Sequence, residues 1–199
     1  MRTSVFLVLC IVFVSVTCKL GDHYPFCLNR PPTGGHSLKT LDGLDLNKYY
    51  GVWYEQLRMT KFFGYKDRCC TAEYHPLADN KISVSNMCSS GEGGNATAYA
   101  QNGNNATLSV DFDLKNFFSV FAKGNYYVLY LEEGEKQYET VMVGEPCRSL
   151  LWILTRSEKV DPAKVQAAIK LAESQGYDTS SAIYRNPDCS QEKINLAQE

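Results

Sequence analysis

The stretch Ala106-Thr107-Leu108-Ser109-Val110-Asp111-Phe112-Asp113-Leu114 alternates apolar and polar side chains. Successive side chains of a β-strand point to opposite faces, so this alternation predicts a strand with one buried and one solvated face. Short connections containing Gly, Asn or Asp separate it from other runs of strand character, and the sequence therefore predicts an all-β fold of eight antiparallel strands. The other seven runs are residues 52–57, 70–74, 82–85, 96–101, 126–131, 138–143 and 150–155.

One segment after the last strand has the period of a helix. Asp161-Pro162 is a typical helix start, and Gly176 is a typical end. Between them an apolar stripe recurs at helical spacing, which predicts a helix over residues 161–174 with one buried face; the stripe consists of Val165, Ala168, Ile169 and Ala172. Eight strands with one dry face each can close into a barrel or stack as a sandwich, and the period alone leaves both open.

Composition places the chain among ordinary globular proteins. It has 199 residues, of which 44% are hydrophobic and 21% charged, enough for one domain with a sizeable core. The formal net charge is −2 and no block of basic residues occurs, so we expect no nucleic-acid partner.

The N-terminal residues 1–18 have the pattern of a secretory signal peptide. A short positive start, Met1-Arg2, precedes an almost unbroken apolar run from Val5 to Val16. The run is shorter than the roughly 20 residues that span a bilayer, which argues against a transmembrane anchor. We therefore expect a secreted, extracellular protein with no transmembrane segment. A lipid-modified Cys18 is a less favoured alternative, because Thr17 is a poor residue before such a cysteine. Residues 19–45 then form an irregular lead-in, residues 46–189 the barrel domain, and residues 190–199 a polar tail.

Cysteine content supports the same compartment. Two of the eight cysteines lie in the signal segment, and an even number in a secreted chain favours three disulfides over zinc ligation; the remaining six are Cys27, Cys69, Cys70, Cys88, Cys147 and Cys189. No Cys-x-x-Cys pair occurs, and the three histidines have no ligand spacing, so no metal site is expected. Asn95-Ala96-Thr97 and Asn105-Ala106-Thr107 are glycosylation sequons, with Asn95 and Asn105 as acceptors.

Strand geometry predicts one of the disulfides. Cys69 and Cys70 are adjacent in a strand, so they point to opposite faces and serve different partners. In a hairpin that turns near residue 79, residues equally distant from the turn face each other, and Cys70 and Cys88 are each nine positions away. The sequence therefore predicts a Cys70–Cys88 bond across the hairpin.

Two further stretches resemble a known family. Asn47-Lys48-Tyr49-Tyr50-Gly51-Val52-Trp53-Tyr54-Glu55 resembles the Gly-x-Trp signature of the lipocalins, and Leu151-Trp152-Ile153-Leu154-Thr155-Arg156 resembles the block on their last strand. The likeness spans roughly residues 44–185 and is strongest to apolipoprotein D and the bacterial outer-membrane lipocalins. It implies a closed, eight-stranded, up-and-down β-barrel with one C-terminal α-helix packed outside. The segment Leu131–Tyr138 departs from the family's usual Thr-Asp-x-Tyr, which bears on any receptor contact at that end of the barrel.

The resemblance also implies roles for individual residues. Gly51, Trp53 and Arg156 would close the base of the barrel as structural residues, through a cation–π contact between the arginine and the tryptophan. The two other disulfides would be Cys69–Cys189 and Cys27–Cys147, as in apolipoprotein D. Inward-facing side chains would bind the ligand; those we expect to do so are Tyr74, Val84, Asn86, Leu108, Val110, Phe112 and Trp152.

These expectations favour a secreted carrier of a small hydrophobic molecule, with no catalytic residue. Fatty acid or other lipid, steroid, retinoid, carotenoid and bilin all remain open as ligands, and beyond such a lipid, tetrapyrrole or carotenoid chromophore no cofactor is expected. A cell-surface receptor, a contact with a membrane surface, and a monomeric or weakly oligomeric state are all compatible with the sequence. Two alternatives are kept: a thiol-dependent isomerase that uses Cys70 as nucleophile, as in one lipocalin branch, and a chromophore-binding subunit of a pigment complex.

Overall fold

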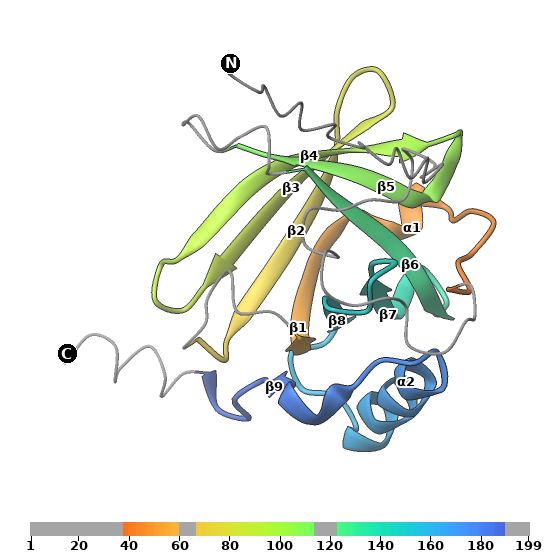
Figure 1. Ribbon diagram of the computed structural model, residues 1–199. Helices are drawn as coiled ribbons and strands as arrows, with labels where there is room; N and C mark the ends of the chain where they lie inside the picture. The colour runs from red at the N-terminus through yellow and green to blue at the C-terminus, as the bar shows by residue number, and fades with distance from the viewer. Residues whose placement is uncertain (1–37, 60–66, 114–122, 190–199) are drawn as a thin grey trace, which may run out of the picture.

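Eight antiparallel strands close into a barrel, with one helix outside it (Figure 1). The computed structural model describes residues 38–59, 67–113 and 123–189. Each strand pairs with the next along the chain, and β1 pairs with both β2 and β8, which closes the sheet. The predicted barrel is therefore confirmed and the sandwich is excluded. The strands are β1 (Gly51–Met59), β2 (Cys70–Pro76), β3 (Lys81–Cys88), β4 (Gly93–Gln101), β5 (Asn104–Phe112), β6 (Lys123–Glu133), β7 (Tyr138–Gly144) and β8 (Leu151–Thr155).

Tight turns connect two of the hairpins. Asp79 and Asn80 join β2 to β3 with φ angles of 59° and 56°, and Asn102 and Gly103 join β4 to β5 with φ angles of 49° and 78°. Two central residues with positive φ twist a hairpin in the same sense as its strands, and Asn, Asp and Gly adopt this conformation most readily. These turns fix the registers of β2 with β3 and of β4 with β5.

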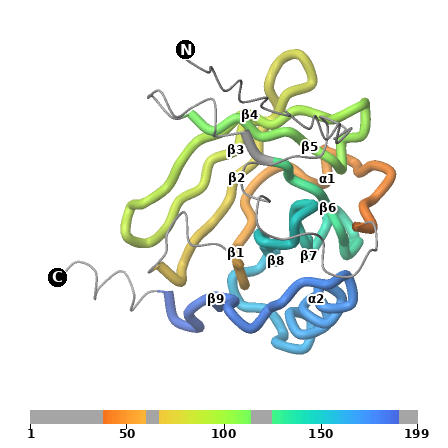
Figure 2. Tube along the Cα trace, in the orientation of Figure 1, coloured from red at the N-terminus to blue at the C-terminus, as the bar shows by residue number. Residues whose placement is uncertain are grey.

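The C-terminal helix α2 (Pro162–Ser174) begins and ends close to its predicted limits. The side chain of Asp161 accepts a hydrogen bond from the backbone N–H of Ala163, and Pro162 occupies the first turn. The apolar stripe packs on the outer face of the barrel, where Leu57, Met142, Leu151 and Ile153 form a cluster with it. Figure 2 shows the course of α2 outside the barrel. Among the described residues, no helix has both the length and the apolar character that a membrane span requires.

A short strand near the C-terminus was not predicted. This strand, β9 (Ile183–Tyr184), pairs with Leu57 and Arg58 of β1. It occupies the edge of β1 beyond Tyr54, where the pairing of β1 with β2 has ended. A 3-10 turn, η3 (Thr179–Ser181), precedes β9, and the chain continues along the gap, where the N–H of Asn186 donates to the carbonyl of Arg68. The C-terminal segment therefore fills the seam between β1 and β2.

A short helix closes one end of the barrel. This helix, α1 (Leu46–Tyr49), is capped by the side chain of Asp45 and leads directly into β1. We call this end, which contains Trp53, the base, and the opposite end, where β1 ends and β2 begins, the distal end. Two apolar clusters follow from the arrangement, one inside the barrel and one between the barrel and α2.

Candidate ligand-binding site

The strand registers place the expected ligand contacts on one continuous inner face. Tyr74 of β2 lies opposite Val84 of β3, Val84 opposite Ala96 of β4, and Ala96 opposite Phe112 of β5. Residues that are opposite in neighbouring strands share a face. Leu108 lies on the same face of β5, where it and Tyr74 pack into the interior cluster.

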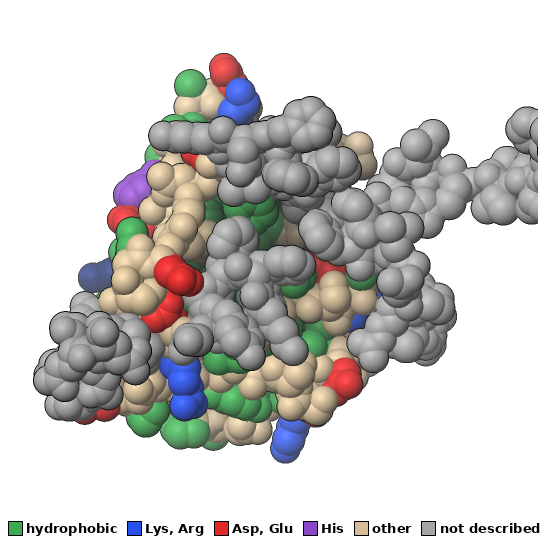
Figure 3. Space-filling view, turned by 60° about the vertical axis from the view of Figure 1, so that its left-hand side comes forward, with side chains coloured by type: hydrophobic (Ala, Val, Ile, Leu, Met, Phe, Trp, Pro, Cys, Tyr) green, Lys and Arg blue, Asp and Glu red, His purple; other side chains and the backbone are tan. Residues whose placement is uncertain are grey.

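Exposure along this inner face rises toward the distal end. Val84, Leu108 and Val110 are buried, whereas Asn86, Phe112 and Trp152 are only partly buried. Asn86 lies near the end of β3, Phe112 ends β5, and Trp152 is close to the start of β8. Figure 3 shows hydrophobic side chains gathered between the parts of the chain drawn in grey. The seven expected residues thus share the inner face, and their contact with a ligand remains a prediction.

The base has the construction that the family resemblance implies. The guanidinium of Arg156 lies 3.8 Å from the centre of the fully buried Trp53 ring. Its Nη atoms donate at 2.8 Å to the carbonyls of Lys48, Tyr49 and Val52, which joins the end of α1 to the end of β8. Gly51 has a φ of 96°, a conformation that strains any residue with a side chain. These residues therefore close the barrel end.

The inner face also contains a charged pair, which the sequence analysis did not predict. Glu55 is opposite Leu154, which belongs to the interior cluster, and Arg58 is opposite Trp152. An irregularity between Glu55 and Leu57 shifts the alternation of β1, so both side chains face inward. If every second residue after Trp53 faced inward, Glu55 would be predicted on the inner face, but Arg58 would be predicted on the outer face of the barrel.

The buried guanidinium of Arg58 is held by several partners. It hydrogen-bonds the Glu55 carboxylate, the carbonyl of Asp67 at 2.5 Å, and the sulfur of Cys70 at 3.6 Å. Burial raises the pKa of the Glu55 carboxyl, and the charges of Arg58 and Arg185 oppose that rise. The Asp67 carboxylate is buried as well and accepts hydrogen bonds from Ser90. The distal part of the interior therefore contains paired charges.

Three tyrosine hydroxyls meet inside the apolar cluster. The Tyr126 oxygen lies 2.5 Å from that of Tyr49 and 3.0 Å from that of Tyr74. Burial raises the pKa of Tyr74 to about 12 and the pKa values of Tyr49 and Tyr126 well above their ordinary value. The sequence identified Tyr74 alone, because Tyr49 comes from α1 and the position of Tyr126 depends on the register of β6.

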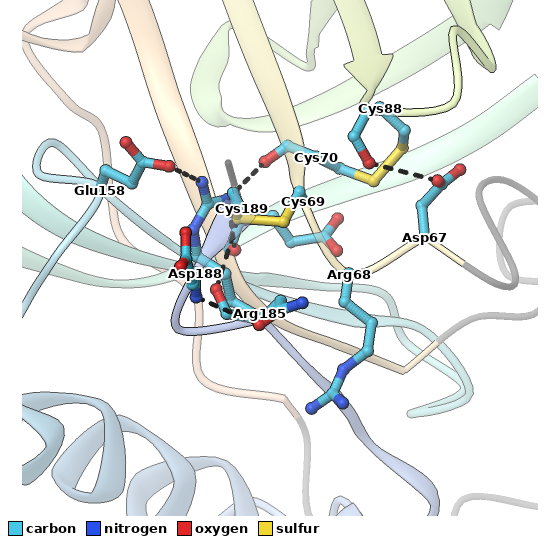
Figure 4. Close-up of a disulfide and its surroundings, with 12 residues drawn as sticks. Asp67, Arg68, Cys69, Cys70, Cys88, Glu158, Arg185, Asp188 and Cys189 are labelled. Carbon is cyan, nitrogen blue, oxygen red and sulfur yellow. Dashed lines mark hydrogen bonds and ion pairs between the residues drawn. A yellow bond between two sulfur atoms is a disulfide. The ribbon is translucent and has the colours of Figure 1, made fainter. Parts of the chain in front are cut away.

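Two disulfides lie side by side at the distal end (Figure 4). Cys70 is bonded to Cys88 directly across the β2–β3 hairpin, and Cys69 is bonded to Cys189. Cys147 is also disulfide-bonded, while Cys27, its expected partner, lies outside the described residues. Since the sulfur of Cys70 is bonded to that of Cys88, Cys70 is not available as the thiolate nucleophile of the isomerase alternative.

The two sequons differ in their surroundings. Asn95 is exposed on the outer face of β4. Asn105 is partly buried, where its side chain accepts from the N–H of Leu44 and donates to its carbonyl, each at 2.8 Å. A glycan on the Asn105 nitrogen would disturb this pair of contacts, so Asn95 is the better acceptor in the folded chain.

A groove outside the barrel does not suit an apolar ligand. It has a volume of about 200 Å³ and lies where β7 and β8 meet the start of α2. Glu139, Thr140, Asp161 and Lys164 contribute to its lining, which is therefore charged and polar. In the part of the chain that the structure describes, His, Cys, Asp and Glu side chains form no cluster of three or more that could hold a metal ion.

The fold and base agree with a comparison against family models, in which the model of the lipocalin-like domain matches residues 44–187. The chain belongs to the lipocalin family. It is 32% identical over 187 residues to the outer membrane lipoprotein Blc of Vibrio cholerae, which covers 91% of this chain and 96% of that lipocalin.

Two further lipocalins extend the comparison. Temperature-induced lipocalin-1 of Arabidopsis thaliana is 30% identical over 157 residues, which covers 75% of this chain and 82% of the relative. Lipocalin 12 from rat epididymis superposes with a TM-score of 0.58 at 13% identity, covering 79% of this chain and 92% of that chain. The last likeness shows the shared fold alone. The resemblance to bacterial outer-membrane lipocalins is thus confirmed, and the likeness to apolipoprotein D stays a prediction.

Proposed function

We propose that the protein is a secreted carrier that binds a small hydrophobic molecule inside the barrel. The observation that carries the proposal is the gradient along the inner face. Aliphatic side chains line its buried part, and Asn86, Phe112 and Trp152 at the distal end keep accessible surface. A ligand entering at the distal end would meet two aromatic rings and one amide before it reaches the aliphatic wall.

Burial alone supplies enough free energy for useful affinity. A ligand that loses ~300 Å² of apolar surface to water gains about 7.5 kcal/mol before the cost of association. Four alanines, Ala72, Ala96, Ala98 and Ala106, belong to the interior cluster, and Gly94 precedes two of them on the inner face of β4. Small side chains on these strands limit how much of the barrel the protein fills with its own atoms.

Disulfide content supports an extracellular location. The Cys69–Cys189 and Cys70–Cys88 bonds persist in oxidising compartments and are rare in reducing ones. We propose that residues 1–18 act as a signal peptide and that Asn95 is glycosylated. The lead-in would then span residues 19–45, the barrel domain residues 46–189 and the polar tail residues 190–199.

Native mass spectrometry of the protein secreted from eukaryotic cells, followed by extraction into organic solvent, tests the proposal. We expect a bound small molecule that leaves on extraction. Trp152→Ala should weaken rebinding of the extracted molecule while the far-ultraviolet circular dichroism stays unchanged. Met87→Ala, on the exposed outer face of β3, is the matched control. Protein that carries no small molecule, and binds none from a lipid extract, would contradict the carrier function.

The same preparation separates the carrier from the pigment alternative. A bilin or carotenoid would give absorption in the visible range, whereas a fatty acid or sterol would leave the sample colourless. The position of Trp152 on the inner face makes its fluorescence a reporter for either class, since the second tryptophan, Trp53, is fully buried at the base.

A further inference from the structure

Three phenol hydroxyls from separate elements converge within the barrel, although apolar side chains would fill a core at lower cost. Tyr49 comes from α1, Tyr74 from β2 and Tyr126 from β6. The Tyr49 and Tyr74 rings have centroids 5.2 Å apart, and those of Tyr74 and Tyr126 are 6.1 Å apart. A buried hydroxyl costs free energy unless it is hydrogen-bonded, so three in one place are costly to a purely structural core.

The three hydroxyls of this cluster are hydrogen-bonding partners of one another. Each hydroxyl donates a single proton, and the Tyr126 oxygen is within hydrogen-bond distance of both other hydroxyls. The hydroxyls of Tyr49 and Tyr74 also interact with each other, so each of the three tyrosines contacts the other two. If Tyr49 and Tyr74 both donate to Tyr126, the Tyr126 proton can be donated to a ligand oxygen.

The cluster lies deep in the barrel and is still accessible at one residue. Tyr49 packs against Trp53 of the base, with 5.3 Å between the ring centroids. Tyr49 and Tyr74 are buried, but Tyr126 is only partly buried. A ligand that enters from the distal end therefore reaches Tyr126 first.

The electrostatic setting favours an electron-rich ligand atom. Burial raises the pKa values of Tyr49 and Tyr74, so both phenols stay protonated at neutral pH and remain donors. The positive charge of Arg156 opposes that rise in both residues and is therefore felt at the cluster. The hydrogen-bonding partners of Arg156 are backbone carbonyls, and Glu139 is a carboxylate whose charge acts on it.

We propose that the hydroxyls of Tyr49, Tyr74 and Tyr126 form a polar subsite that donates a hydrogen bond to an oxygen atom of the ligand. This inference rests on the carrier function. The ligand class it names is an apolar molecule with a hydrogen-bond-accepting oxygen at one end, such as a carboxylate, carbonyl or hydroxyl, and without positive charge. The oxygen enters first and the hydrocarbon part lies between the subsite and the distal end.

Three probes with one hydrocarbon chain test this orientation. Dodecanoate, dodecan-1-ol and dodecylamine bury the same chain and differ in the head group, and tryptophan fluorescence follows their binding at neutral pH. In the wild type we expect the acid and the alcohol to bind about tenfold or more tighter than the amine, because the ammonium group cannot accept a hydrogen bond. Comparison of the acid with the alcohol distinguishes a charged from a neutral oxygen.

Tyr126→Phe keeps the ring and removes the hydroxyl that joins the other two. We expect this variant to weaken the binding of dodecanoate and dodecan-1-ol about three- to tenfold and to leave the affinity for dodecylamine unchanged. Tyr74→Phe provides a second variant, and Tyr99→Phe, on the outer face of β4, is the control.

The outcomes separate the subsite from the carrier function. If head groups make no difference in the wild type, or if Tyr126→Phe and Tyr74→Phe both weaken all three probes equally, the subsite is wrong while the carrier remains. If the wild type binds none of the three, the carrier function and the subsite both fail.

Discussion

Arg156→Lys separates the structural role of the base from ligand binding. Arg156 donates hydrogen bonds to the carbonyls of Lys48, Tyr49, Tyr50, Val52 and Tyr138 and stacks on Trp53. A lysine keeps the charge, but its single nitrogen has three donors and no planar surface. At least two hydrogen bonds are lost, at about 1 kcal/mol each, together with part of a cation–π contact worth ~0.5–2 kcal/mol. We therefore expect a loss of about 2–3 kcal/mol in the free energy of unfolding.

Urea denaturation and thermal unfolding measure this loss. For a chain of this size, 2–3 kcal/mol corresponds to a decrease in Tm of roughly 4–12 °C. The affinity for dodecanoate should stay within about twofold of the wild type, since the charge beside the tyrosine cluster is retained. Lys170→Arg, at an exposed lysine of α2, is the control and should change the unfolding free energy by less than about 0.5 kcal/mol. A stable Arg156→Lys variant with much weaker binding would refute the structural role.

Three further perturbations test other parts of the molecule. Replacing Cys69 and Cys189 together by alanine should lower the unfolding free energy by about 2–4 kcal/mol and increase hydrogen exchange in β9, whereas an unchanged Cm in urea would show that the seam does not depend on the bond. Burial raises the pKa of Glu55 above 4.5, so its contribution to stability is fully present below about pH 4.5 and is lost as the pH rises through the folded-state pKa. The unfolding free energy of the wild type minus that of Glu55→Gln should therefore fall between pH 4 and pH 7, and a rise would show that Arg58 outweighs burial. Glycosidase treatment of the secreted protein should shift the mass of the wild type and of Asn105→Gln, but not of Asn95→Gln; a glycan found on Asn105 alone would contradict the accessibility argument.

Local pattern was sufficient for the strands and for much of the inner face. Alternation from Ala106 onward marks β5, and the same rule places Tyr74, Val84 and Trp152 inside, because a regular strand has a period of two. The position of Cys70 opposite Cys88 follows from the turn alone, since the hairpin is centred on Asp79 and both cysteines are nine positions away from it. Closure into a barrel did not follow from the pattern and required the family resemblance.

The features that sequence reasoning missed depend on irregularity or on contacts distant in the chain. Arg58 faces inward because of the irregularity after Glu55, and no residue in this stretch is of a type that predicts such an irregularity. Tyr126 reaches Tyr49 and Tyr74 across 77 and 52 residues of sequence, respectively. The two residues of β9 are too few to show a period, and their pairing with β1 depends on the space that β2 leaves.

The barrel interior thus contains two sets of polar groups, one near the distal end and one near the base. They differ in the cost of forming a hydrogen bond to a ligand oxygen. Near the distal end, Arg58 is already bound to the Glu55 carboxylate and the Asp67 carbonyl, so a ligand oxygen would have to displace a paired, buried charge. At the tyrosine cluster the hydroxyls are uncharged, so a ligand oxygen that accepts a hydrogen bond from Tyr126 separates no ion pair. A ligand with one polar end therefore gains more by placing that end at the base than at the distal end. The aliphatic wall between the two sets favours the same orientation, since it solvates hydrocarbon and offers a head group no partner.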